Sequence, residues 1–328
     1  MSKIALVFPR DFTVTHASLN PDVRVVCGDG EQTEASSGDE EFVEVVVGME
    51  KVRLALRGFK VMRPPRPARS NGSDAVYLAS GRDKRDGLIL QYLPPHATTS
   101  HHYHASTRET FHPLAGEAVL RTPWGTETSL TERRSVTSEE FVPHQVVTGE
   151  SASVVLIEMV FPDASVGMED HFYVDVQAAI DVDSRGEVPA SALSNFASHD
   201  LSVDDVACAS MEGFLQALKE PDADAQRAIC ALVGIDAKRR GVELSRARQI
   251  SDPLYWQGQA VDRHSAAYQG LLDRAYGELA KVGGFQTALL ATGNALLTHR
   301  VGKKIPSETI LTETEFCSRL LRIRHSLR

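Results

Sequence analysis

The stretch HHYHASTRETFHPLAG, residues 101–116, decides how the first half of the chain folds. Its residues His102 and His104 are separated by one position, and alternate residues of a strand point to the same face of a sheet. Residues 105–107 are typical of a turn, after which a second strand carries Glu109 back beside the two histidines. The stretch therefore predicts two strands that bring two imidazoles and one carboxylate together.

A later strand adds a third imidazole to this group. The segment EEFVPHQVV, residues 139–147, supplies His144. Three imidazoles and a carboxylate suit a divalent ion such as Fe, Mn, Zn, Ni or Cu. We expect the nearby His96, His101 and His112 to be surface residues or to support the ligands rather than to bind the ion. The predicted metal ligands are His102, His104, Glu109 and His144.

The rest of the first half consists of short runs that are typical of β-strands. Each run is rich in Val, Ile, Leu and aromatic residues and is bounded by Gly, Pro, Ser or Asp, which is the pattern of a sandwich or a barrel. Two polar stretches, residues 29–40 and residues 63–73, are predicted to be loops. The runs are FVEVVVG (42–48), DAVYLASG (74–81), GLILQYL (87–93), EAVLRTPWG (117–125), EFVPHQVVTG (140–149) and ASVVLIEMVF (152–161).

The pattern changes to a helical period near residue 185. Residues 226–233 form a predicted short helix that Gly234 stops, and residues 262–282 place their apolar side chains on one face. The last helix begins after Thr312, which fits a capping box with Glu315. The second half is therefore predicted to be mainly helical.

These patterns predict a multidomain chain. Its length of 328 residues fits two domains at roughly 100–200 residues each. We expect an all-β domain in residues 1–185, followed by a mainly α-helical domain in residues 186–328. The role of the first 70 residues beyond extra strands and loops is not evident from the sequence.

Composition limits the classes of function. With 35 Lys and Arg against 44 Asp and Glu, the net charge is −9, which argues against general binding of nucleic acid. No apolar run approaches the roughly 18 residues of a membrane-spanning helix. The four cysteines form no CxxC pair, so a reduced, cytoplasmic protein with no membrane partner is expected.

One predicted helix of the second half carries chemically interesting side chains. Ser210 is a plausible N-cap, and the helix is expected to run to about Lys219, because Pro221 limits its extension. On this helix Glu212, Gln216 and Lys219 share one face, while the apolar residues occupy the other. Spacing alone leaves two interpretations open, a charged face in solvent or a catalytic carboxylate beside an amine.

The histidine-rich stretch resembles the first motif of the cupin family. That motif places HxH, four residues, Glu, six residues and Gly, and here His102, His104, Glu109 and Gly116 keep the spacing. The second motif is partial, since Pro143 precedes His144 but the usual Gly is absent. The Gly expected six residues before the HxH pair is replaced by His96. The resemblance covers roughly residues 75–175 and implies a small β-barrel with a metal in its mouth and a possible homodimer formed through it.

Three segments of the second half resemble, in order, the NADAR family of N-glycosidases. They are LSNF (193–196), SMEGFLQALK (210–219) and LLATGNALLTH (289–299). The resemblance spans roughly residues 190–328. It implies cleavage of the C–N ribosyl bond of a riboflavin-pathway intermediate or an ADP-ribose conjugate, with no cofactor. The implied catalytic residues are Glu212 and Lys219, and the implied substrate-binding residues are Asn195, Phe196, Gln216, Trp256, Thr292, Gly293 and Asn294.

The chain departs from that family in one place. Many members carry an acidic residue and Trp-Gly after the LLATG element, whereas no Trp follows Trp256 here. Glu308 or Glu313 is a candidate substitute for the acid.

Three functions therefore stay open on sequence grounds. The first is an N-glycosidase with the metal-binding domain in a supporting role, the second a metal-dependent cupin enzyme, and the third a non-catalytic sensor of ADP-ribose or a nucleotide. In the first and third, the partner is a small nucleotide-type molecule.

Overall fold

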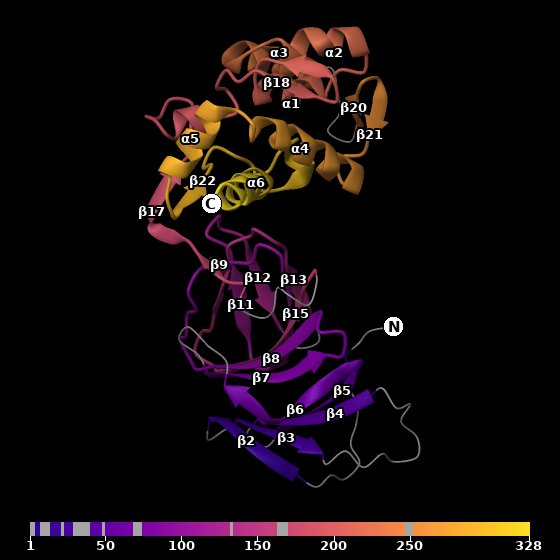
Figure 1. Ribbon diagram of the computed structural model, residues 1–328, viewed down its shortest axis with the longest axis vertical. Coiled ribbons are helices and arrows are strands. Elements are labelled where there is room, and N and C mark those ends of the chain that lie inside the picture. Colours follow the sequence, from indigo (N-terminus) through magenta and orange to yellow (C-terminus); the bar gives the residue numbers. More distant parts are fainter. Residues whose placement is uncertain are drawn as a thin grey trace. The chain divides into compact units, whose positions relative to one another are not determined.

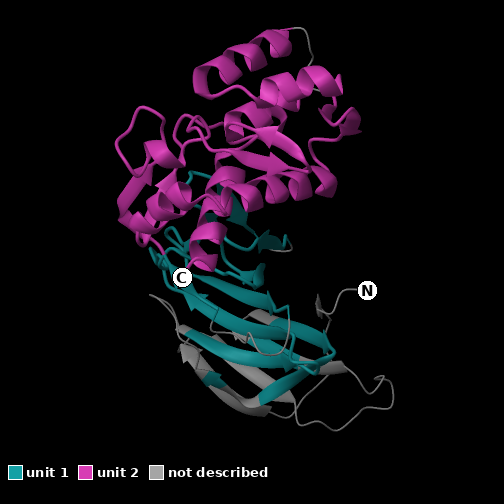
Figure 2. Ribbon diagram, turned by 45° about the horizontal axis from the view of Figure 1, so that its top comes forward, with its two compact units in different colours: residues 1–173 teal, residues 174–328 magenta. Residues whose placement is uncertain are grey.

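The structure is a computed structural model (Figure 1). It describes residues 4–6, 14–20, 23–28, 40–47, 50–67, 74–131, 134–162, 170–246 and 252–328. The chain divides into two compact units, unit 1 in residues 1–173 and unit 2 in residues 174–328 (Figure 2). Each unit has its own set of buried apolar side chains.

Unit 1 is built from antiparallel strands. Its first sheet has the order β1-β5-β4-β3-β2 and its second the order β13-β10-β15-β8-β7-β6. The strands of the first sheet are β1 (Ile4–Leu6), β2 (Val14–Asn20), β3 (Val23–Gly28), β4 (Glu40–Val47) and β5 (Glu50–Arg57). Those of the second are β6 (Phe59–Pro67), β7 (Asp74–Gly81), β8 (Asp86–Leu93), β10 (Arg108–Ala115), β13 (Val136–Ser138) and β15 (Ser153–Val160).

Two smaller sheets complete the described part of unit 1. One has the order β12-β11-β14, and the other pairs β16 with β9. Their strands are β9 (His102–Tyr103), β11 (Ala118–Arg121), β12 (Glu127–Leu130), β14 (Gln145–Val147) and β16 (Phe172–Tyr173). The prediction of strands for the first half of the chain is thereby confirmed.

The central strands β8 and β15 are covered on both faces. Leu90 and Leu156, which are paired in the ladder, belong to one cluster of buried side chains, whereas Ile89 and Ile157 belong to another. Because neighbouring side chains of a strand point to opposite faces, the sheet separates two cores. A strand buried on both faces needs no polar alternation, which explains why Gln91 alone interrupts the apolar run in residues 87–93.

The two stretches predicted to be loops have different outcomes. Residues 63–67 belong to strand β6, so the prediction of a loop there was wrong. β6 is the edge strand of its sheet, where proline is tolerated because its missing N–H breaks no ladder bond. Residues 68–73 and residues 29–39 of the other stretch lie outside the described residues.

Unit 2 has six α-helices in its described residues, together with short strands (Figure 1). The largest of its fully buried side chains are aromatic, and no helix of the described chain is long and apolar enough to cross a membrane. The helices are α1 (Met211–Ala217), α2 (Ala223–Cys230), α3 (Gly234–Arg246), α4 (Ala266–Leu279), α5 (Gly283–Ala291) and α6 (Glu313–Ser326). The strands are β17 (Asp175–Asp181), β18 (Leu201–Val203), β19 (Val206–Cys208), β20 (Leu254–Trp256), β21 (Gln259–Val261) and β22 (Ala295–Thr298), and 3-10 turns cover Ser191–Leu193 and Pro306–Glu308.

Two helix starts follow the signals in the sequence. The Ser210 hydroxyl accepts a hydrogen bond from the backbone N–H of Gly213 at 3.0 Å, which caps α1. Thr312 and Glu315 form the predicted capping box at the start of α6. These side chains satisfy backbone N–H groups that have no partner within the helix, so the two starts are fixed locally.

Helix α2 begins three residues earlier than the apolar period predicted. The Asp222 carboxylate accepts hydrogen bonds from the backbone N–H groups of Asp224 and Ala225 at 3.1 and 2.8 Å. This cap starts the helix ahead of its first buried side chain. Gly234 then begins α3 with a φ of 53°, a conformation that glycine adopts without strain.

The division between the units falls at Tyr173 and Val174, before the change of period near residue 185. Strand β17 explains the difference, because it pairs in parallel with β22 and belongs to unit 2 through that ladder. Its partner lies more than a hundred residues later, so nothing local in the sequence marks β17 as part of the helical unit.

Candidate functional site

A cluster of metal-binding side chains lies in unit 1. One nitrogen or oxygen atom from each of His102, His104, Glu109 and His171 lies within 4.8 Å of the others. β9 carries His102, β10 carries Glu109, and His171 directly precedes β16, which pairs with β9. Pairing of β9 with β16 therefore brings His171 to the residues of the sequence motif.

Glu109 is the centre of this cluster. One of its carboxylate oxygens, Oε2, lies 3.0 Å from His104 Nε2, 2.8 Å from His144 Nε2 and 3.8 Å from His102 Nε2. Burial alone would raise the pKa of Glu109, but the charge of His104 and the contacts with the imidazoles hold that pKa well below its usual range. A buried carboxylate that stays ionised among imidazoles is suited to bind a cation.

In three of the histidines, the other ring nitrogen, Nδ1, contacts an oxygen atom of the protein. Nδ1 of His102 lies 3.1 Å from the Ser100 carbonyl oxygen, and Nδ1 of His104 contacts the carbonyl oxygen of Asp170. Nδ1 of His144 lies 2.9 Å from the hydroxyl of Ser138 and 2.9 Å from the carbonyl oxygen of Val142. An oxygen acceptor at Nδ1 favours a proton on that nitrogen, so Nε2 is the atom that would bind a metal, as in histidines that bind metals.

The Nε2 atom of His104 has no hydrogen-bond partner of good geometry although the residue is only 2% exposed. An unsatisfied buried nitrogen costs free energy unless a ligand uses its lone pair. The residues present therefore fit a divalent transition metal, and the donor set does not specify which one.

The predicted ligand set was partly different. His102, His104 and Glu109 lie together as expected, and His144 contacts the same carboxylate oxygen, but the compact set contains His171 instead of His144. His171 was not predicted as a ligand, because it lies in the chain after the strands that carry the two cupin-type motifs. Burial and the charges of His104 and His102 lower the pKa of His171 to about 4, so its ring is neutral near pH 7.

The three extra histidines have separate surroundings. His96 is 67% exposed and lies 3.5 Å from Glu150, and His112 contacts Ser135 and Glu158. His101 is half-buried. Burial is the main cause that lowers its pKa, and the charge of His144 lowers that pKa further.

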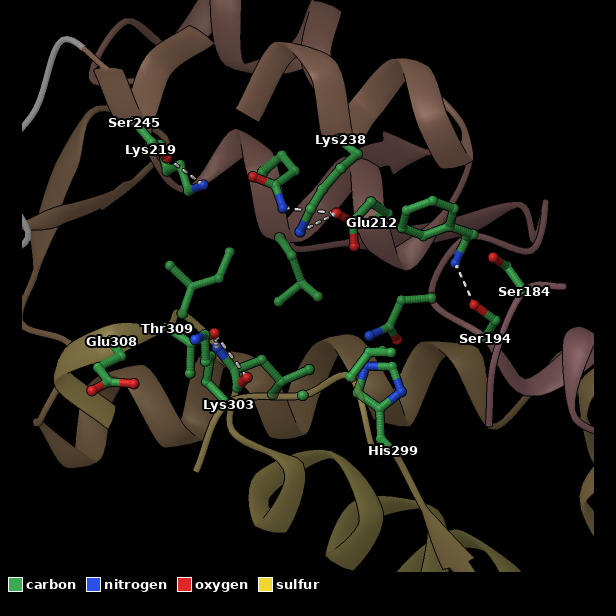
Figure 3. A pocket seen from close by; sticks show the side chains of 18 of the residues that line it. Ser184, Ser194, Glu212, Lys219, Lys238, Ser245, His299, Lys303, Glu308 and Thr309 are labelled. Atoms are coloured by element: carbon green, nitrogen blue, oxygen red, sulfur yellow. Dashed lines mark hydrogen bonds and ion pairs between the residues drawn. The ribbon is translucent and has the colours of Figure 1, made fainter. Parts of the chain in front are cut away.

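Unit 2 contains a cavity of about 1030 Å³ (Figure 3). Helices α1 and α3 form one wall, and the loop of residues 299–311 forms another. Both polar and apolar side chains line it. The polar lining residues include Asp183, Ser194, Asn195, Glu212, Gln216, Lys219, Lys238, Ser245, Asp252, Arg263, His299, Lys303, Glu308 and Thr309.

Glu212 is the most enclosed carboxylate of this cavity, with 5% exposure. Its Oε1 atom accepts a hydrogen bond from Gln216 Nε2 at 2.8 Å and lies 3.4 Å from Lys238 Nζ. Figure 3 shows the Glu212 and Lys238 side chains meeting at the cavity wall. The predicted helix face therefore lines a cavity rather than bulk solvent. Lys238, on α3, is its cationic partner and was not predicted.

The other implied residues near this wall have defined partners. Lys219 Nζ donates to Gly241 O at 3.2 Å and to Ser245 Oγ at 2.8 Å, and so is bonded to α3. Asn195 Oδ1 accepts from the Tyr276 hydroxyl at 3.1 Å. Both residues, together with Phe196, line the cavity.

Four implied substrate-binding residues do not line this cavity. Trp256 donates its N–H to Asp204 at 2.9 Å and packs edge-on against Phe214, so it belongs to the core. The remaining three are held by two arginines, one in α6 and one after it. The Thr292 hydroxyl accepts from Arg324, and Gly293 and Asn294 accept from Arg328.

Glu308 and Glu313, the two candidate substitutes for the missing acid, have different surroundings. Glu308 lines the cavity, whereas Glu313 accepts a hydrogen bond from the backbone N–H of His299 at 2.8 Å and is 4% exposed. Glu313 therefore supports the wall that carries His299.

Comparison with known proteins finds a family match within unit 2. Residues 187–325 match the family described as bacteriophage protein GP30.3. The uncharacterized 17.1 kDa protein of the Gp30–rIII intergenic region of Enterobacteria phage T4 is 36% identical over 150 residues, which cover 45% of this chain and 98% of that protein.

Several solved structures are weakly similar to part of the chain. CapF, a capsular polysaccharide assembling protein from Staphylococcus aureus, gives a TM-score of 0.30 at 16% identity and covers 34% of this chain and 35% of its own. A predicted oxalate decarboxylase from Thermotoga maritima gives 0.28 at 17% identity, covering 31% and 98%. The DMSP lyase DddQ from Ruegeria pomeroyi gives 0.25 at 17% identity, covering 30% and 48%. TM-scores this low carry no inference about activity.

The NADAR resemblance was wrong. The segments that carried it lie within the region that matches GP30.3, and the NADAR family is not matched. The LLATG-type element has a structural explanation, because its last residues end α5 and are bonded to Arg324 and Arg328. Short motifs of common residues were therefore not specific enough to assign the family.

Proposed function

The chain belongs, through residues 187–325, to the bacteriophage GP30.3 protein family, and we propose that its unit 1 adds a metal-dependent, cupin-type enzyme site to that family's fold. His102, His104, Glu109 and His171 would hold the ion. His144 would support the site through its contact with the Glu109 carboxylate. The observation that carries this proposal is the convergence of four donor atoms, one each from His102, His104, Glu109 and His171, within 4.8 Å of one another.

When bound, a divalent transition metal supplies a Lewis acid that polarises an oxygen-bearing substrate. The residues of the chain orient the donors. Ser100, Ser138 and Asp170 hold the Nδ1 sides of three imidazoles, so that their Nε2 atoms converge on Glu109. Glu109 contributes the negative charge that balances the cation.

Metal content measured after chelation and reloading tests the proposal. The protein is incubated separately with Fe²⁺, Mn²⁺, Ni²⁺, Zn²⁺ and Cu²⁺, desalted, and analysed by mass spectrometry of the metal. We expect about one equivalent in the wild type, a loss in His104→Ala, and full retention in His112→Ala, whose ring contacts Ser135 and Glu158. Equal metal content in the wild type and His104→Ala would reject the site.

A second candidate is hydrolysis of an N-glycosyl bond in the cavity of unit 2, favoured by the enclosed Glu212 carboxylate. Cleavage of a C–N ribosyl bond passes through an oxocarbenium-like state, by analogy with O-glycosides. A carboxylate beside the sugar carbon stabilises that charge and takes a proton from the attacking water. The water oxygen bonds to the sugar carbon as the C–N bond breaks, and the leaving nitrogen takes a proton, for which Lys238 is the nearest ammonium donor.

A panel of N-ribosides, riboflavin-pathway intermediates and ADP-ribosylated nucleosides tests this second candidate. We expect release of free base or free ADP-ribose by the wild type and a loss of about 100-fold or more in Glu212→Gln. Glu243→Gln is the matched control, because Glu243 is an exposed α3 residue paired with Arg240. Binding of a panel member without any product would indicate a sensor instead.

A further inference from the structure

The segment Asp170–Tyr173 immediately precedes unit 2, and its first residue is anchored between two metal-binding side chains. The Asp170 carboxylate accepts hydrogen bonds from the backbone N–H groups of Ala105 and Ser106 at 3.3 and 2.8 Å and from the Thr107 hydroxyl at 2.9 Å. These three residues form the turn between His104 and the strand of Glu109. Asp170 therefore fixes the segment to the turn that sets the distance between His104 and Glu109.

The next residue, His171, packs among the imidazoles. Its ring stacks on His102 with centroids 4.9 Å apart and meets His104 edge-on at 4.4 Å. No hydrogen bond to the His171 ring is found among the described residues, in contrast to the rings of His102 and His104. A ring that lies among other nitrogen and oxygen donors without a hydrogen bond of its own is in a grouping that a bound cation would stabilise.

The two residues that follow form a short ladder with β9. Phe172 and Tyr173 pair with Tyr103 and His102 in a two-residue ladder, and Phe172 stacks on Tyr103 at 5.5 Å. Both side chains stay at least one-third exposed. An isolated ladder of this length is marginal in water.

We propose that the bound metal ties residues 170–173, the last residues of unit 1, to the rest of the metal site, with His171 as the ligand supplied by this segment and Asp170 as its positioning residue. This inference rests on the proposed metal site. It adds that metal loading changes the stability of a specific stretch of chain, residues 170–173, because a coordinate bond to His171 adds to the contacts that its ring already makes.

Amide hydrogen exchange of the full chain, with and without Zn²⁺, tests the proposal. Zinc is expected to slow exchange in peptides covering residues 171–174 by about tenfold or more in the wild type. In His171→Ala at saturating zinc the protection should be lost, and zinc affinity measured against a chelator should fall by about 10–100-fold. His112→Ala should behave like the wild type.

Zinc content, measured on the same samples, distinguishes a failure of the metal site from a failure of the role of His171. A wild type that binds no zinc rejects the metal site itself. A wild type and His171→Ala that both bind zinc with the same affinity and the same protection reject only the role of His171. Asp170→Asn provides a second variant, which is expected to keep most of the zinc affinity while raising exchange in both states, and unchanged exchange would overturn the positioning role of Asp170.

Discussion

At the scale of single residues, unit 1 shows how far spacing can predict a site. The HxH pair and Glu109 could be placed together from their positions alone, because strand geometry fixes which side chains share a face. His171 could not, since its position depends on the pairing of β16 with β9, and β16 follows a stretch outside the described residues. Lys238 was missed in unit 2 for a similar reason, because the approach of α3 to α1 is a tertiary contact.

The charge of Glu109 should dominate metal affinity. Glu109→Gln keeps the shape of the side chain but removes the only carboxylate of the compact donor set. We expect metal affinity, measured by titration calorimetry, to fall by at least about 100-fold, more than for loss of a supporting residue. Glu158→Gln is the control, since that carboxylate contacts His112; an equal loss in both variants would show that the effect is not specific.

Glu315 should make stability depend on pH. Burial alone would raise its pKa, but hydrogen bonds from Arg263, Thr312 and Gln269 lower it. A carboxyl group whose pKa is lower in the folded state stabilises the fold above its unfolded pKa of about 4.3 and loses that contribution as the pH falls through the folded value.

Accordingly, Glu315→Gln should lower the free energy of unfolding by about 1–3 kcal/mol at pH 7. The difference from the wild type should shrink as the pH is lowered below about 4, as measured by urea unfolding at several pH values. A difference that stays constant with pH would contradict the role of the ionised carboxylate.

At the scale of elements, two helices of unit 2 begin where the sequence predicts, whereas the packing around them is set by tertiary contacts. Ser210 and Thr312 could be identified as caps because the interaction lies within one turn. The close packing around α1 could not be foreseen. A side chain on Gly213 would lie 2.6 Å from the carbonyl oxygen of Leu232, and one on Gly241 would lie 1.7 Å from Gln216 Oε1.

The space around two helical glycines predicts opposite effects for their replacement by alanine. Gly213→Ala should destabilise unit 2 by about 1–3 kcal/mol, because the new methyl group meets backbone oxygen atoms that cannot move aside easily. Gly277→Ala, on α4, meets nothing within 4 Å and should stabilise it by about 0.5–1 kcal/mol through better helix propensity. Thermal unfolding compares the two, and a shift of the same sign in both would contradict this account of the packing.

At the scale of the whole molecule, the division into two units agrees with the length of the T4 relative, which matches less than half of the chain. The T4 protein is matched over 98% of its length by less than half of this chain. The described residues of unit 2 have their own buried aromatic core, so we expect unit 2 to fold without unit 1. The change of period in the sequence predicted two domains, but the position of the boundary required the β17–β22 ladder.

Residues 174–328, produced alone, should therefore unfold cooperatively with the same midpoint as one transition of the full chain. Addition of a binding metal at about 100 times its dissociation constant should stabilise only the other transition, by about 2.7 kcal/mol. Differential scanning calorimetry measures both effects. An equal metal-induced shift in the isolated fragment would place the metal outside unit 1.

The parallel pairing of β17 with β22 also has a consequence for biosynthesis. Asp175 pairs with Ala295, and Asp181 pairs with Thr298. During translation the ribosome releases β17 more than a hundred residues before its partner β22, whereas every described strand of unit 1 has been released together with its ladder neighbours by residue 173. β17 therefore lacks its ladder partner until residues 295–298 have been synthesised, and the closure of that ladder is a late event in the folding of unit 2.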